Sequence, residues 1–267
     1  MDGSTPTNGR RRLFAWLPWL LPGLGLLAWW AVTRQGWAPP YLLPSPGQVA
    51  RAGKVYVLGG QGAMAGRFLP DAAASLSRVF TGFFLACALG LPLGLLSGRL
   101  ALVNRSLSTT VNAVRAVPGI ALLPLALAWF GIGMKTTVFL VAVAAFFPIY
   151  LNAQAGARGA PGLWLDSGAM MGAGRAGLVF RVLVPAAMPH VVTGLRLGLG
   201  ISWAYLVLGE LTGVPDGLGA AIMDARMLGR LDLILVGILL IAVLGRLSDR
   251  VLTLGLKTFF ASARRLP

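Results

Sequence analysis

Long blocks of apolar residues, separated by short stretches rich in arginine, glycine or proline, run through almost the whole chain. A helix needs about 20 mostly apolar residues to cross the hydrocarbon core of a bilayer. Blocks of this length predict an all-α integral membrane fold with six transmembrane helices, at Leu13–Thr33, Val79–Gly98, Val111–Gly131, Thr136–Ala155, Ala186–Glu210 and Leu231–Leu254.

The first and third blocks differ from a simple span. The first follows Arg10–Arg12, as in a secretory signal peptide, but its apolar run is too long and no cleavage site of small residues follows it. The third contains Pro118-Gly119 and Pro124, and proline cannot donate a helical hydrogen bond. We therefore expect an interrupted helix in the third span.

Basic residues between the blocks indicate the orientation. With the N-terminus in the cytoplasm, the inside segments carry roughly twice as many Lys and Arg residues as the outside ones, as the positive-inside rule requires. This orientation makes residues 1–12 a cytoplasmic tail, 34–75 a periplasmic loop and 257–267 a basic cytoplasmic tail near anionic lipid. The proline and glycine content of the outer loop predicts irregular structure. The basic residues assigned to the inside are Arg10–Arg12, Arg99, Arg105, Arg115, Arg158, Arg175, Arg181, Arg250, Lys257, Arg264 and Arg265.

Composition narrows the function classes. Hydrophobic residues make up 57% of the chain and charged residues 12%, whereas an average soluble domain has about 25% charged residues. This argues against a water-soluble enzyme, and the single Cys87 excludes a disulfide scaffold. The net charge of +15 could indicate nucleic-acid binding, but the basic residues are spread between the apolar blocks. We therefore attribute the charge to membrane topology.

The residues that catalysis requires are missing from the pattern. His190 is the single histidine and no triad or metal-ligand spacing surrounds it. No phosphate-binding G-x-x-x-x-G-K-[ST] loop occurs. Gly172, Gly174 and Gly177 read G-x-G-x-x-G, but a loop after a span precedes them instead of a strand. The sequence predicts a non-enzyme that binds no cofactor or metal itself.

Small residues recur every fourth position along the second span, at Gly82, Ala86, Gly90, Gly94 and Gly98. Such a ladder lets another helix backbone approach closely within lipid. Chance is the alternative in a chain with 36 glycines.

In the fifth span, Arg196, Trp203 and Glu210 lie seven residues apart, so they share one helix face, roughly opposite Gly194 and Gly198. A charged residue in a span usually faces the protein interior or a water-filled cavity. One interpretation makes this polar face part of a pathway or subunit seam, with the glycines packed against a sister helix. The other is that Arg196 snorkels to the cytoplasmic interface and Glu210 is a helix end.

The longest cytoplasmic loop, Gly156–Pro185, carries apolar residues at helical spacing, including Met170 and Met171. The break at Gly172–Gly174 predicts two short helices joined by a turn. An apolar-faced helix on a cytoplasmic loop suits docking into a groove on another protein. An amphipathic segment on anionic lipid is the alternative.

The loop also resembles a known family. The pattern is Asp166-Ser167-Gly168, then Gly172, then Val182-Leu183-Val184-Pro185, and it is similar to the E-A-A…G…I-x-L-P loop of permease subunits of binding-protein-dependent ABC importers. The resemblance extends from Leu43 to Phe260. Within this range the chain resembles the nitrate, sulfonate and taurine branch of the family at Leu43–Pro46, Ser75–Val79, Leu123-Pro124, Trp129–Gly133, Phe146–Ile149, Thr193–Arg196 and Asp224–Arg226.

This resemblance implies a type I ABC importer permease in the bacterial inner membrane, with a five-helix core over 76–256 and a coupling loop over 156–185. Two copies would form one pathway for a small anionic solute such as a sulfonate, taurine or nitrate. Two cytoplasmic ATPase subunits would bind ATP, and a periplasmic solute-binding protein would deliver the solute. The alternative is a self-contained channel or secondary carrier.

The shared helix face of Arg196, Trp203 and Glu210 makes these three residues candidates for the pathway. The resemblance implies the coupling residues. Asp166, Ser167 and Gly168 replace Glu and two alanines of the family pattern, and glycine weakens a helix by about 1 kcal/mol relative to alanine. We therefore expect a looser coupling contact, or one that the ATPase orders. The coupling residues would be Asp166, Ser167, Gly168, Met170, Met171, Gly172, Val182 and Pro185.

Overall fold

The computed structural model describes residues 17–39, 41–62 and 64–259, and within these ranges it contains helices and no strand. The predicted tails 1–12 and 260–267, and residues 13–16 of the first predicted span, lie outside the described residues. The elements are α2 (Leu17–Arg34), α3 (Pro46–Leu58), α4 (Phe68–Arg99), α5 (Ala101–Arg115), η1 (Gly119–Leu122), α6 (Leu123–Phe130), α7 (Met134–Gly159), α8 (Gly162–Met170), α9 (Arg175–Leu178), η2 (Val179–Leu183), α10 (Val184–Glu210), α11 (Leu218–Met227) and α12 (Leu231–Phe259).

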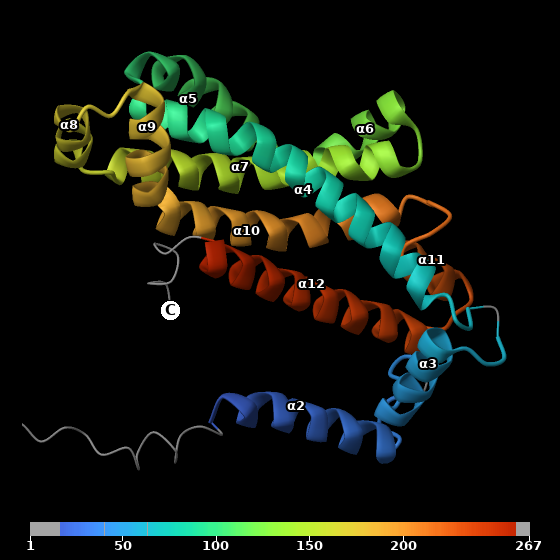
Figure 1. The fold of residues 1–267 in the computed structure, drawn as a ribbon. Helices are drawn as coiled ribbons and strands as arrows, with labels where there is room; N and C mark the ends of the chain where they lie inside the picture. The colour runs from blue at the N-terminus through green and yellow to red at the C-terminus, as the bar shows by residue number, and fades with distance from the viewer. Residues whose placement is uncertain (1–16, 40, 63, 260–267) are drawn as a thin grey trace, which may run out of the picture.

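Helix α7 lies at the centre of the bundle, with α4 on one side and α10 on another (Figure 1). The predicted glycine ladder of α4 faces α7. A Cβ atom at Gly94 would lie 2.5 Å from the carbonyl oxygen of Tyr150, and one at Gly98 would lie 2.5 Å from that of Gln154. Side chains of any size are therefore excluded here, and the two backbones touch. The ladder prediction is confirmed.

The glycines of α10 make the second close approach to α7. A Cβ atom at Gly194 would lie 3.0 Å from the carbonyl oxygen of Pro148, and one at Gly198 would lie 2.9 Å from Cγ1 of Ile149. This confirms that Gly194 and Gly198 pack against a sister helix. Close approach increases van der Waals contact, which matters in lipid because burial of apolar area no longer drives helices together.

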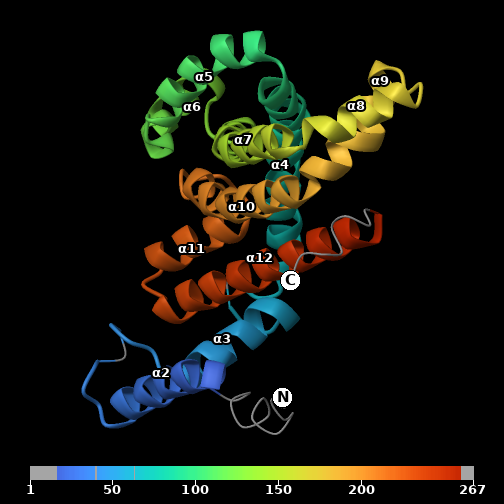
Figure 2. The ribbon, with the colours of Figure 1, turned by 90° about the vertical axis from the view of Figure 1, so that its left-hand side faces the viewer.

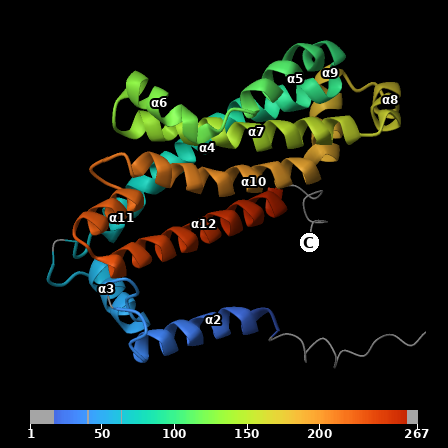
Figure 3. The ribbon, with the colours of Figure 1, turned by 180° about the vertical axis from the view of Figure 1, so that it is seen from behind.

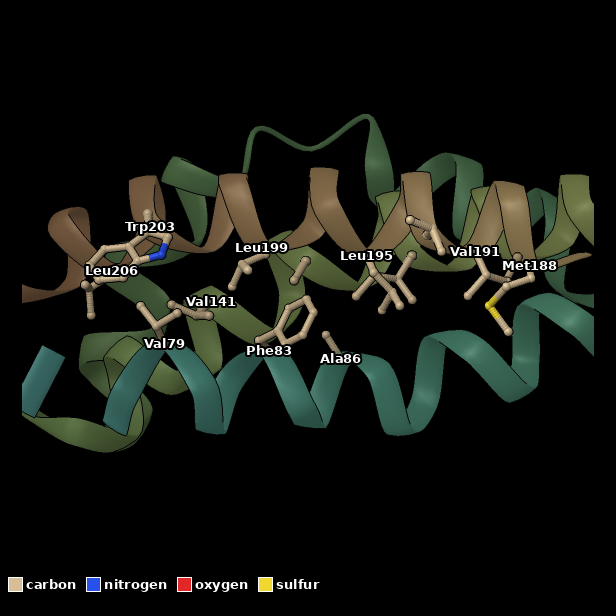
Figure 4. Packing of buried hydrophobic residues seen from close by; sticks show 14 of the residues in the cluster. Val79, Phe83, Ala86, Val141, Met188, Val191, Leu195, Leu199, Trp203 and Leu206 are labelled. Atoms are coloured by element: carbon tan, nitrogen blue, oxygen red, sulfur yellow. The ribbon is translucent and has the colours of Figure 1, made fainter. Parts of the chain in front are cut away.

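Apolar side chains fill the space between α4, α7 and α10 (Figure 4). Phe83 and Val79 of α4 meet Leu199 and Leu206 of α10 in this layer, and all four are at most 3% exposed. The residues are small where the helix backbones touch and large where the helices diverge. The layer is therefore filled along its whole length. The other labelled members are Ala86, Val141, Met188, Val191, Leu195 and Trp203.

The outer segment 34–75 contains a helix, which corrects the expectation of irregular structure. Helix α3 begins with a capping box, in which the Ser45 hydroxyl accepts from the Gln48 amide and the Gln48 side chain accepts from the Ser45 amide. Pro46 occupies the first turn, where its missing amide proton is not needed. Val49 and Tyr56 of α3 then pack in a second apolar cluster with residues of α11 and α12.

Four helices of the described chain are long and apolar enough to cross a membrane: Phe68–Arg99, Met134–Gly159, Arg175–Glu210 and Leu231–Thr258. They correspond to the second, fourth, fifth and sixth predicted spans. A further candidate joins α5 to η1 and α6 with a bend of 85°. The predicted interruption of the third span is confirmed, but its helix begins ten residues earlier than expected, at Ala101 instead of Val111.

Helix α2 corresponds to the first predicted span and lies apart from the main stack, to which α3 connects it (Figures 2 and 3). Its leucines Leu21, Leu24 and Leu27 are exposed. The indole N–H of Trp29 donates to the carbonyl of Pro44, 3.0 Å away, and fixes the start of the outer segment to α2. Helix α2 is not among the four candidate spans, so the total of six spans stays a prediction.

Replacing Gly94 by alanine should destabilise the protein, because the new methyl group would meet backbone that cannot move aside. We expect a loss of about 1–3 kcal/mol in the free energy of unfolding, as for overpacked cores. Unfolding of the purified protein in detergent measures it. Gly200→Ala is the matched control, because a Cβ atom there meets nothing within 4 Å. Equal stability of the two variants would contradict the backbone contact.

Candidate functional sites

The segment that follows α7 projects from one end of the bundle as α8 and α9 (Figure 1). A turn joins the two helices, and Gly172 lies in it with a φ of 82°. Residues other than glycine rarely adopt this left-handed backbone conformation. The predicted pair of short helices with a glycine turn is therefore confirmed.

The predicted coupling residues differ in exposure. Met170 and Met171 are 88% and 87% exposed, and Asp166 and Ser167 are exposed beside them. Val182 and Pro185 are half-buried where the segment returns to the bundle, and Gly168 is half-buried in α8. The sequence reasoning missed three further large apolar side chains exposed on this segment, which are Leu163, Trp164 and Phe180. The sequence could have indicated this exposure, because large apolar residues in a short helix of a loop cannot pack into the core of the bundle.

The packing of α8 on α9 bears on the glycine at position 168. A Cβ atom at this position would lie 2.8 Å from Cδ2 of Leu178 in α9 and 3.4 Å from Cγ2 of Val182. Alanine, which the family pattern places here, would make the flexible end of the Leu178 side chain move aside. Glycine weakens α8 as an isolated helix but lets α8 pack closely on the next helix.

The coupling segment continues into α10 without a break. One π-helical turn, η2, links α9 to α10, and the Val184 amide donates to the carbonyl of Val179. Pro185 follows in the first turn of α10 and has no amide proton to donate. Helical structure therefore runs without a break from Arg175 to Glu210.

The candidate pathway residues of α10 all bind partners within the chain. The Arg196 guanidinium forms a two-pronged ion pair with Asp249 of α12, at 2.8 and 3.1 Å. The Trp203 indole N–H donates to the Ser248 hydroxyl of α12 at 3.0 Å. Glu210 is fully buried. Two of the three thus face α12, and their role in a pathway stays a prediction.

Glu210 is the centre of a buried polar cluster at the outer end of the bundle. Its carboxylate accepts from the Arg78 guanidinium at 2.7 Å, from the Ser75 hydroxyl at 2.9 Å and from the Gly219 amide at 2.8 Å. Arg78 also pairs with the Asp216 carboxylate. Because a buried charge needs a partner, this cluster ties α4, α10 and the start of α11 together. The sequence reasoning did not connect Arg78 and Ser75 to Glu210.

Asp71 extends the cluster to α3. Its carboxylate accepts from the Tyr56 hydroxyl at 2.7 Å and from the Gly217 amide at 3.2 Å. Burial raises the pKa of Tyr56 above its usual value, and the hydrogen bond to Asp71 raises it further. Tyr56 therefore stays a neutral donor, and Asp71 links α3 and α4 to the start of α11.

A second polar cluster joins α4, α5 and α7 toward the coupling end. The Ser97 hydroxyl accepts from the Tyr150 hydroxyl and from the Gln154 amide, both at 2.8 Å. Gln154 also donates to the Asn104 side chain at 3.0 Å. The bundle is thus closed by hydrogen bonds at both ends of its apolar layer.

Comparison with known proteins identifies the architecture. Residues 90–255 match the family described as binding-protein-dependent transport system inner membrane component. The chain belongs to this family. The inward-facing MetNI methionine ABC transporter has a chain of the same fold, with a TM-score of 0.55 and 23% identity, over 68% of this chain and 93% of that one.

Two relatives align over most of their length. The permease is 35% identical over 224 residues to the taurine transport system permease protein TauC of Escherichia coli, covering 84% of this chain and 81% of TauC. It is 32% identical over 242 residues to SsuC, a Bacillus subtilis protein named as an aliphatic sulfonates transport permease, covering 90% and 85%. The chain is thus a multi-pass membrane permease of an ABC importer, not an enzyme, and it works with an ATPase and a solute-binding protein.

Arg78→Met should destabilise the permease strongly, because it leaves Glu210 buried without its cation. Breaking a buried ion pair costs about 3–5 kcal/mol of unfolding free energy. Unfolding in detergent measures the loss. The control is Arg230→Gln, which breaks the exposed pair with Asp232 at the outer turn and should cost less than about 1 kcal/mol. Similar losses in both variants would contradict the central role of the buried pair.

Proposed function

We propose that this permease imports a small organic sulfonate such as taurine, with nitrate as a related small anion in the same branch. The names of TauC and SsuC support this assignment, and their alignments extend across most of both chains. The 35% identity to a taurine permease over 84% of the chain is the observation that carries the proposal.

The active assembly contains two copies of this chain around one pathway, two ATPase subunits in the cytoplasm and a solute-binding protein in the periplasm. ATP is bound by the ATPase subunits. The chain lies in a bacterial inner membrane with both termini in the cytoplasm. The distribution of Lys and Arg between the spans supports this orientation, because inside loops are enriched in basic residues.

The segment α8–α9 docks into a groove on the ATPase. Its exposed methionines and the neighbouring Trp164 and Phe180 form an apolar surface at the end of the bundle, and a helix with an apolar face binds such grooves. The continuous helix from Arg175 carries the movement of the docked segment into the bundle. ATP shifts the assembly between inward- and outward-facing states through its different affinity for the two states.

Solute uptake tests the proposal directly. The chain, its ATPase and its solute-binding protein are expressed together in a bacterium without sulfonate importers, and uptake of labelled taurine, methanesulfonate and nitrate is measured. We expect saturable uptake of a sulfonate that disappears when the ATPase carries an inactive nucleotide site. Uptake without the ATPase would support the carrier alternative, and absence of uptake of all three solutes would contradict the proposed substrates.

Gly172→Leu tests the docking segment. Leucine at a φ of 82° strains the backbone by about 1–2 kcal/mol, and relief of the strain reorganises the turn between α8 and α9. We expect membrane insertion at the wild-type level, with loss of ATPase co-purification and of uptake. Gly213→Leu is the matched control, because Gly213 has a φ of 101° and also meets nothing within 4 Å, but lies after α10. Retained uptake in Gly172→Leu would contradict the docking role.

A further inference from the structure

A break in a membrane helix exposes irregular backbone within the bundle. Helix α5 ends at Arg115, residues 116–118 are not helical, and the chain resumes at Gly119 as η1 and α6. The two parts are bent by 85°. Short-range hydrogen bonds pair the amides of Ala116 and Val117 here, and non-helical backbone of this kind is tolerated at membrane depth where protein covers it or where it lines a water-filled cavity.

The break borders a cavity of about 420 Å³ between α5, α7 and α10. On α7 its wall includes Phe147 and Leu151, and on α10 it includes Leu197 and Ile201, all from the middle parts of these long helices. Figures 1 and 3 show α5 and α6 passing along α7 on the side away from α12. The cavity therefore lies at middle depth in the bundle.

Arg115 lines this cavity. The sequence reasoning started the third span at Val111, so Arg115 fell near its inner end. The helix starts at Ala101 instead. Fifteen residues at 1.5 Å each carry the chain roughly 20 Å from the end of α4 before Arg115 is reached.

Two polar groups in the cavity have no partner among the described residues. The Arg115 guanidinium is exposed and forms no ion pair or hydrogen bond there, and neither does the Tyr205 hydroxyl of α10. Tyr205 reaches the break because Gly119 has no side chain. A Cβ atom at Gly119 would collide with the Tyr205 hydroxyl. In contrast, Arg78 and Arg196 are both neutralised by carboxylates.

We infer that the cavity of Arg115 and Tyr205 binds the transported anion on its way through the permease, an inference that rests on the proposed function. The guanidinium supplies the charge for a sulfonate group, and the hydroxyl supplies a donor in the same cavity. The remaining walls are mostly apolar, with Val117, Leu122 and Ile201 among them. One cation and one hydroxyl against apolar walls match a small alkanesulfonate better than nitrate, which has no apolar part.

Uptake kinetics of the complete importer test the inference with taurine, methanesulfonate and butanesulfonate. Loss of a charge-assisted contact should lower transport by Arg115→Gln roughly 10- to 100-fold. Arg115→Lys should recover part of the rate, and Tyr205→Phe should raise the KM for sulfonates. Arg105→Gln is the matched control, an exposed arginine of the same helix outside the cavity. ATPase stimulation by the loaded binding protein is measured in each variant.

Retained stimulation with lost uptake in Arg115→Gln supports the inference, and wild-type uptake in that variant overturns it. Equal losses in Arg115→Gln and Arg105→Gln also overturn it, because a general effect of charge would explain both. If the unaltered importer takes up none of the sulfonates, the proposed function fails instead.

Thiol labelling decides the point if Arg115→Gln does not assemble. In a Cys87→Ala background, Arg115→Cys should react with a membrane-impermeant anionic methanethiosulfonate, and the sulfonate substrate should slow the reaction. Val111→Cys is the control, because Val111 lines the adjoining, mostly apolar cavity between α4, α5 and α7 and is not among the residues around the cavity of Arg115. A reactive Val111→Cys with an inert Arg115→Cys would overturn the inference.

Discussion

Contact between the backbones of three helices is the constraint on which the rest of this permease depends. Glycines of α4 and α10 bring both helices against α7, until Gly94 meets the carbonyl of Tyr150 and Gly194 that of Pro148. In lipid, burial of apolar surface does not drive helices together, so van der Waals contact in this close packing has to supply the attraction. Everything else is attached to this rigid triple layer: α3, α11 and α12 at one side, α5 and α6 at another, and the docking segment at one end.

Charge placement follows from the same rigidity. Polar clusters around Glu210 and Ser97 lie at the two ends of the layer, where they satisfy groups that lipid would otherwise leave unpaired. Arg196 is neutralised by Asp249. Against this background Arg115 is conspicuous, because it lies beside a broken helix and has no partner among the described residues.

Transmission of movement also depends on covalent continuity. The docking segment is joined to α10 through a single π-helical turn, and α10 contacts α7 along its glycine face. A force on α9 therefore reaches the buried layer and the cavity wall without crossing a flexible loop. The exposed methionines, Trp164 and Phe180 fit the proposed docking, because they extend beyond the bundle, where a partner subunit would supply their packing.

The sequence by itself determined the features that depend on neighbours along the chain. The approximate places of four spans, the glycine ladder of α4, the break at Pro118 and the turn at Gly172 are all periodic or local signals. The capping box of α3 at Ser45 and Gln48 is a local signal of the same kind, which the sequence reasoning missed. Only the tertiary structure decided which helix meets the ladder and that Arg78 pairs with Glu210, 132 residues away. It also showed that Arg115 lines a cavity between α5, α7 and α10. Such facts depend on how helices cross in space, and hydrophobic periodicity carries no information about which surfaces of distant segments meet.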